Sequence, residues 1–256
     1  MSDPAVGGRR GRPVTVLLVH GIRASRTMWL RQLAALEEAG VPALAPDLPG
    51  HGERSAEAFT LDGAYAAIED AARSAGGEVV VVGLSLGGYL ALHWAARTAQ
   101  PVAGVLAAGC STRPRGPGLA GYRRLARVIA RLPDGGRGLN DTLARLALPP
   151  QAVADLDAGG TALGVMDAAL AAVAGIDPVA DLRVLGDVPV RLVNGRWDHF
   201  RLEERRLLAA CANGRLHVVP GAHHLVSLVR PAEFNAIMLD LLTEVGAGPV
   251  RGGGSG

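Results

Sequence analysis

The sequence has 256 residues, of which 49% are hydrophobic and 20% charged, with a formal net charge of +2. These values fit a globular enzyme and exclude an extensively disordered chain, and they give no general case for nucleic-acid binding. Two cysteines are too few for a disulfide framework, and no apolar stretch reaches the ~20 residues of a membrane span. We therefore expect a cytoplasmic protein without a membrane span.

Apolar runs alternate with helical patterns along most of the chain. The runs are continuous, which is typical of parallel strands buried on both faces. We predict strands at 14–19, 41–45, 78–83, 101–108, 188–193 and 215–219. We predict helices at 27–39, 61–75, 86–98, 201–212 and 231–245. This order predicts an α/β fold with a doubly wound, mostly parallel sheet and ligands at the carboxyl ends of the strands.

The segment 110–177 breaks this alternation. It is helical or irregular, and we predict a helical lid insert across the strand ends, because long connections are usually functional. The alternative is two ordinary connecting helices. The core then comprises 14–109 and 178–245, between a flexible N-terminal arm at 1–13 and a flexible tail at 246–256.

The most informative motif lies at 83–87, where Gly-Leu-Ser-Leu-Gly connects a predicted strand to a predicted helix. A sharp turn there holds Ser85 clear of the sheet, and the flanking glycines let strand and helix approach closely. The pattern alone is a weak signal, but the strand before it and the helix after it are the required context. Ser85 is therefore the candidate nucleophile.

Further motifs follow other predicted strands. His20-Gly21 closes the first strand, and residues 47–52 read Asp-Leu-Pro-Gly-His-Gly after the second. A run ending in Asp198 follows the strand 188–193, and a run ending in His223-His224 follows the last strand. With these motifs, the sequence from residue 14 to residue 245 resembles the α/β-hydrolase family.

The resemblance implies a role for each motif. It implies Asp198 as the triad acid and His224 as the base, seven residues before Pro231, with Asp177 or Asp181 as alternative acids. His223 then stands where the family usually has glycine, so it either shapes the substrate pocket or marks a register shift of one residue. The backbone N–H groups of Ile22 and Leu86 are the implied oxyanion-hole donors.

The function that follows is hydrolysis of carboxylic esters through an acyl-enzyme on Ser85. The alternatives are an esterase or thioesterase for carrier-protein-linked acyl groups, and a carbon–carbon bond hydrolase or lyase of the same fold. A non-catalytic ligand-binding protein is a further alternative, against which the complete apparent triad counts. Fold alone cannot separate these activities.

The predicted lid is basic. Eight arginines and two aspartates lie between Cys110 and Pro150. Arg123 and Arg127 share one helical face, which predicts contact with an anionic substrate group or an acidic carrier protein. The alternative is a solvated helix face. We expect a small-molecule ester substrate, no nucleic acid partner, no metal and no cofactor.

Overall fold

The structure is a computed structural model that describes residues 13–247, so the predicted arm (1–13) and tail (246–256) lie almost wholly outside the described residues. Six strands form one sheet in the order β2-β1-β3-β4-β5-β6, and each neighbouring pair is parallel. The strands are β1 (Val14–Val19), β2 (Ala43–Leu44), β3 (Glu78–Leu84), β4 (Val102–Ala108), β5 (Val190–Gly195) and β6 (Gly214–Val219). The predicted parallel sheet is confirmed.

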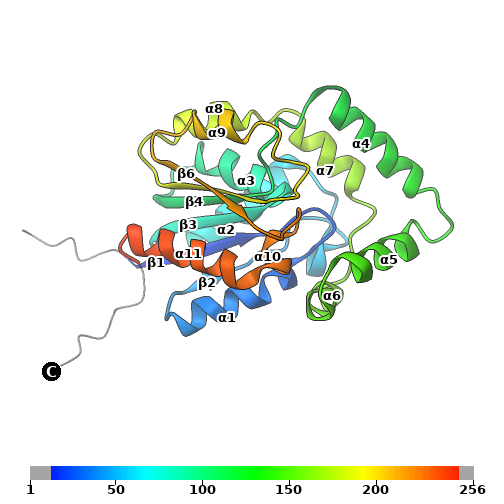
Figure 1. The fold of residues 1–256 in the computed structure, drawn as a ribbon, viewed down its shortest axis with the longest axis horizontal. Helices are drawn as coiled ribbons and strands as arrows, with labels where there is room; N and C mark the ends of the chain where they lie inside the picture. The colour runs from blue at the N-terminus through cyan, green and yellow to red at the C-terminus, as the bar shows by residue number, and fades with distance from the viewer. Residues whose placement is uncertain (1–12, 248–256) are drawn as a thin grey trace, which may run out of the picture.

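Helices cover both faces of this sheet (Figure 1). On one face lie α1 (Leu30–Glu38), which follows a 3₁₀ turn at Arg26–Trp29, and also α10 (Val226–Val229) and α11 (Pro231–Glu244). On the other lie α2 (Leu61–Ala75), α3 (Leu86–Ala95), α8 (Pro178–Val184) and α9 (Glu204–Leu208). A second 3₁₀ turn spans Gly52–Arg54.

The continuous apolar runs are strands because both of their faces are buried. In β3, Val79 and Val81 pack into the core under α2 and α3, while Val80 and Val82 pack into the core under α1 and α11. All four side chains are fully buried. A strand with solvent on one face would alternate apolar and polar residues instead.

Three of the predicted elements need correction. The strand predicted at 41–45 contains only the two residues of β2. The helix predicted at 201–212 contains only the five residues of α9, because the chain before it forms a loop from Asp198. The helix predicted at 86–98 ends at Ala95. The helices α8 and α10 were not predicted, although Asp177 caps α8 by accepting from Val179 N and Ala180 N, with Pro178 next in the chain.

The segment 110–177 holds four helices that lie beyond one end of the sheet (Figure 1). They are α4 (Gly116–Ile129), α5 (Arg137–Ala147), α6 (Pro150–Asp157) and α7 (Met166–Val173). Side chains of α4, α5, α6 and α7 line cavities that open around the loops following β1 and β3. The insert therefore covers the carboxyl ends of the strands, where ligands bind in folds of this kind.

Candidate active site

Ser85 occupies a strained turn between β3 and α3. Its φ of 58° and ψ of −116° lie in a region that residues with a side chain rarely adopt. Ser85 N donates to Ala108 O at 2.8 Å, which ties the turn to β4. A Cβ at Gly87 would collide with the Val19 carbonyl oxygen, and one at Gly83 would collide with the Gly87 carbonyl oxygen. The predicted need for both glycines is confirmed.

His224 and Asp198 form a hydrogen-bonded pair on neighbouring loops. His224 Nδ1 lies 3.1 Å from Asp198 Oδ1 and 3.2 Å from Oδ2, and Phe200 N donates to Oδ1 at 2.8 Å. Burial alone would raise the pKa of Asp198, but the hydrogen bond and charge of His224 outweigh burial and hold that pKa below its ordinary value. The carboxylate therefore stays charged and fixes the proton on Nδ1 of His224.

The two residues predicted to supply backbone donors for an oxyanion line the same cavity as Ser85. Leu86 is the first residue of α3, and N–H groups in a first helical turn have no partner within the helix. Ile22 lies in the loop after β1, where Gly21 N donates to the Met28 sulfur at 3.3 Å and so fixes the loop. Ile22, Ser85 and Leu86 line one cavity together.

Two cavities meet at Ser85. The first, which we call the Leu170 cavity, has a volume of about 360 Å³ and lies against α3, α4 and α7. The second, which we call the His224 cavity, has a volume of about 290 Å³ and lies against α5, α6 and the loops of β1 and β6.

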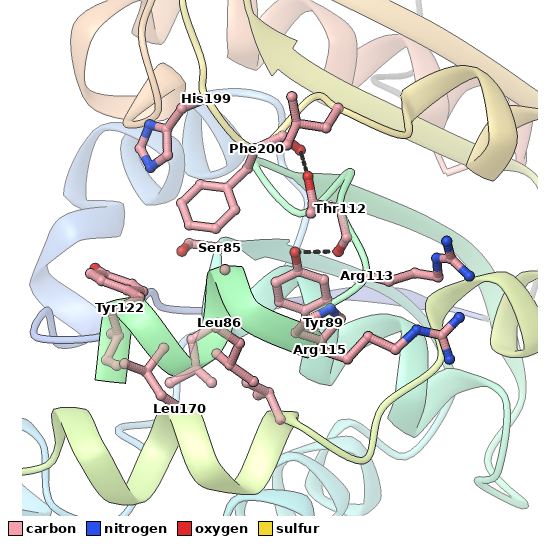
Figure 2. A pocket seen from close by; sticks show the side chains of 16 residues that line it. Ser85, Leu86, Tyr89, Thr112, Arg113, Arg115, Tyr122, Leu170, His199 and Phe200 are labelled. Atoms are coloured by element: carbon pink, nitrogen blue, oxygen red, sulfur yellow. Dashed lines mark hydrogen bonds between the residues drawn. The ribbon is translucent and has the colours of Figure 1, made fainter. Parts of the chain in front are cut away.

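Figure 2 shows the Ser85 hydroxyl between the rings of Phe200 and Tyr122. The hydrogen bonds found among residues 13–247 do not include one between Ser85 and His224. Both side chains line the His224 cavity, and catalytic hydrogen bonds often shorten only when substrate is bound.

Aromatic side chains surround the base. The rings of Phe200 and His224 have centroids 4.7 Å apart, and those of His199 and His224 are 5.4 Å apart. Partial burial, followed by the charge of His224, lowers the pKa of His199. His199 and Phe200 line both cavities, so the loop after Asp198 forms part of the wall around the nucleophile.

The two alternative acids, and the histidines His20 and His93, have partners elsewhere. Asp181 pairs with Arg97 and lies 3.1 Å from His93 Nδ1, while Asp177 caps α8. His20 is fully buried; its Nε2 accepts from Leu48 N at 2.9 Å, and its Nδ1 lies 2.9 Å from the Gly21 carbonyl oxygen. These contacts give His20 a structural role in the loops after β1 and β2.

The predicted substrate-binding residues separate into two groups. His223 lines the His224 cavity, and its Nε2 lies 3.0 Å from the Ala147 carbonyl oxygen at the end of α5. Arg123 and Arg127 line neither of the two cavities. Their Nε atoms lie 2.8 and 3.8 Å from Asp167 Oδ1 on α7. The structure thus brings His223 to the site and leaves the two arginines on its outer side.

Several lining residues were missed in the sequence analysis. Tyr122, Leu170 and Phe200 belong to no motif. Gly109, which follows β4, lines neither cavity but lies against the His224 ring, and it was missed as well. A signal existed for Phe200 alone, since it stands two residues after the candidate acid. The insert side chains could be placed only once the fold of residues 110–177 was known.

Within the described residues, no group of three or more histidine, cysteine, aspartate or glutamate side chains is arranged to hold a metal ion. Over the same part of the chain, no helix combines the length and apolar character needed to cross a membrane.

A parallel sheet, a strained serine at a strand–helix turn and a His–Asp pair on later loops together define the α/β-hydrolase arrangement. The family model described as "Alpha/beta hydrolase family" matches residues 16–237. The protein therefore belongs to the α/β-hydrolase family.

Two curated relatives match parts of the chain. It is 38% identical over 96 residues to lipase LipV of Mycobacterium tuberculosis, covering 37% of this chain and 36% of the lipase. It is 41% identical over 103 residues to the biotin biosynthesis bifunctional protein BioHC of Cellvibrio japonicus, covering 40% of this chain and 20% of that protein.

Solved structures match the fold over nearly its whole length. An esterase from Thermogutta terrifontis has a TM-score of 0.75 at 25% identity, covering 92% of this chain and 91% of the esterase. MenH from S. aureus has a TM-score of 0.71 at 19% identity, covering 91% of this chain and 95% of MenH. The enol-lactonase from Burkholderia xenovorans has a TM-score of 0.71 at 24% identity, covering 93% and 94%. Because MenH and the lactonase are less than 25% identical to this chain, their likeness to it concerns the fold alone.

Proposed function

We propose that this hydrolase cleaves carboxylic esters through an acyl-enzyme, with Ser85 as nucleophile, His224 as base and Asp198 as the acid that orients the base. One observation carries the proposal: Asp198 holds His224 through Nδ1, which leaves Nε2 for the strained Ser85 that lines the same cavity. The esterase and lipase among its relatives support the choice of ester substrates.

The reaction follows from this arrangement. Ser85 Oγ bonds to the ester carbonyl carbon while its proton passes to His224 Nε2. The carbonyl oxygen takes the negative charge beside the N–H groups of Ile22 and Leu86. Collapse reforms the carbonyl, breaks the ester C–O bond and returns the proton to the leaving oxygen. Water then attacks the acyl-enzyme with His224 as base, which releases the acid and restores Ser85.

The charges around Ser85 favour esters over substrates with a further carboxylate, which the carbon–carbon hydrolases and lyases of this fold would need to hold. Arg113 lines the Leu170 cavity, but its Nη2 lies 2.6 Å from Glu203. Arg115 lies 3.7 Å from Asp177. Both guanidinium groups point away from Ser85 in Figure 2.

A carrier-linked acyl ester is the second candidate, favoured by the basic surface of the insert. Arg124, Arg131, Arg137 and Arg145 are exposed, and the ion pairs found within the described residues do not include them. Steering by exposed charge weakens as salt rises. If an acidic carrier is the substrate, kcat/KM for its ester should fall with salt and in Arg124→Glu/Arg131→Glu, while p-nitrophenyl ester turnover should not.

Ester cleavage is tested directly with p-nitrophenyl esters of increasing acyl length. We expect a burst of p-nitrophenolate equal to the enzyme concentration if deacylation limits turnover, and a loss of several orders of magnitude in Ser85→Ala. Retention of turnover in Ser85→Ala, with wild-type circular dichroism, would refute the proposal.

A further inference from the structure

The two cavities at Ser85 differ in which catalytic group they contain. Five residues line both: Ile22, Ser85, Tyr122, His199 and Phe200. His224 lines the His224 cavity and is absent from the lining of the Leu170 cavity. Leu86, whose N–H is a proposed oxyanion donor, lines the Leu170 cavity alone. Substrate at Ser85 can therefore extend in two chemically distinct directions.

The path of the proton determines which cavity receives the alcohol part of an ester and which receives the acyl part. This argument rests on the proposed function, in which His224 receives the Ser85 proton and then gives it to the leaving oxygen. His224 must reach both oxygens from one position, so the leaving oxygen lies on the side of Ser85 that faces His224. The alcohol attached to that oxygen continues into the His224 cavity.

The acyl group then extends away from His224, toward the Leu170 cavity. The tetrahedral carbon carries Ser85 Oγ, the oxyanion, the leaving oxygen and the acyl chain. With the oxyanion at Leu86 N–H and the leaving oxygen toward His224, the remaining bond points away from His224. We propose that the Leu170 cavity binds the acyl chain of the substrate and the His224 cavity binds the alcohol.

The acyl cavity fits an unsubstituted hydrocarbon chain. Leu119, Leu170 and Val173 are among its walls, and Leu119 and Tyr122 pack against Leu170 in one apolar cluster. The Tyr89 hydroxyl donates to the Thr112 carbonyl oxygen at 2.6 Å, so the proton of this polar group is already engaged. Along the apolar walls formed by Leu119, Leu170 and Val173, a polar substituent on the acyl chain would lose its water without gaining a hydrogen-bond partner.

The alcohol cavity fits a bulkier alcohol that also carries a hydrogen-bonding group. Leu143, Ala144 and Leu156 supply apolar walls, while Asn140 and Thr161 supply polar ones. Its position next to α5 gives His223 a role, because the contact of His223 with Ala147 fixes the end of the helix that forms this wall. We expect selection for the alcohol to depend on α5 and selection for the acyl chain to depend on α4 and α7.

Two ester series separate the cavities. One varies the acid from acetate to octanoate on a fixed alcohol, and the other varies the alcohol from methyl to benzyl on a fixed acid. Leu119→Trp partly fills the acyl cavity and Ala144→Trp partly fills the alcohol cavity. Both sites are half-buried and tolerate a larger side chain better than the fully packed core. Val128→Trp, exposed on α4 and outside both linings, is the matched control.

We expect Leu119→Trp to lower the octanoate-to-acetate ratio of kcat/KM by roughly tenfold or more and to leave the benzyl-to-methyl ratio within about twofold. Ala144→Trp should do the reverse, and Val128→Trp should change neither ratio. A second acyl-side variant, Gly118→Trp, gives the same test if Leu119→Trp does not fold, because Gly118 is exposed, lines the same cavity and has open space around its Cβ position.

Exchanged effects would overturn the assignment, as would ratios that fall together or stay unchanged in both variants. These ratios are defined for any variant that still turns over esters. The proposed function is tested by a different experiment: if it is wrong, ester turnover is retained in Ser85→Ala.

Discussion

The imidazole of His224 lies where a side chain at Gly109 would project. A Cβ at position 109 would come 3.0 Å from His224 Cε1, 3.1 Å from Nδ1 and 3.4 Å from Asp198 Oδ2. Gly109 also has a φ of 60°, which favours glycine. The His–Asp pair therefore packs directly against the backbone that follows β4. A glycine is needed at position 109 because of this close packing and because of the positive φ.

Gly109→Ala should move the base away from Ser85 and strain the backbone. The ring has to shift by a few tenths of an ångström, so we expect kcat to fall by about tenfold, less than the ~100-fold that a displacement of about 1 Å can cause, and the free energy of unfolding to drop by about 1–2 kcal/mol. Steady-state kinetics and urea unfolding measure the two effects. Gly175→Ala is the matched control, because a Cβ there meets open space. Equal behaviour of the two variants would contradict this account of the pair.

The adjacent histidines should give different phenotypes. His224→Ala should lose nearly as much turnover as Ser85→Ala, because triad members act as a unit. His223→Ala removes the contact with the Ala147 carbonyl and should change mainly the preference among alcohols. The two ester series with both variants provide the measurement. Loss of all turnover in His223→Ala alone would mean that the base is His223.

Stability should decline in mild acid because of His20. Burial, followed by the charge of His51, lowers the pKa of His20 to about 3 from 6.5. Below pH 6.5, His20 is protonated in the unfolded chain but stays neutral in the native state. The free energy of unfolding therefore falls as pH falls from 6.5 toward 3. This one group accounts for about 2 kcal/mol between pH 6.5 and 5, at 1.36 kcal/mol per pH unit.

His20→Gln removes the titrating ring and tests this linkage. Its free energy of unfolding should be lower than that of the wild type at pH 7, and should decline less between pH 7 and 5. Urea unfolding at a series of pH values gives both slopes. Equal slopes in the two proteins would show that His20 does not titrate as its burial implies.

The fold was predictable because its signals are local or nearly so. The strand β1 and the helix α2 have the predicted bounds, since an apolar run defines the first and Thr60 and Gly76 cap the second. The turn at Ser85 was likewise predictable, because Gly83 and Gly87 each lie two residues from Ser85 in the sequence. The short helix α9 was not, because the loop from Asp198 takes up residues whose pattern alone favours a helix.

The surroundings of the site depend on contacts between distant residues. Arg123 meets Asp167 across 44 positions of sequence, so the charge of α4 read by itself misses its partner. The division of the site into two cavities arises where α4, α5 and α7 meet the loop of Phe200, and no periodicity in the sequence encodes that meeting. For these reasons the sequence analysis identified the candidate catalytic residues and left the substrate cavities undescribed.

The central claim, that Ser85 is the activated nucleophile, is tested most directly by reaction with a fluorophosphonate followed by peptide mass spectrometry. The account predicts one phosphonyl adduct per chain, located on Ser85, and no adduct in Ser85→Ala with an unchanged circular dichroism spectrum. Loss of the ring in His224→Ala should slow labelling of Ser85 by orders of magnitude. A stoichiometric adduct on another residue, or full labelling of Ser85→Ala, would contradict the account.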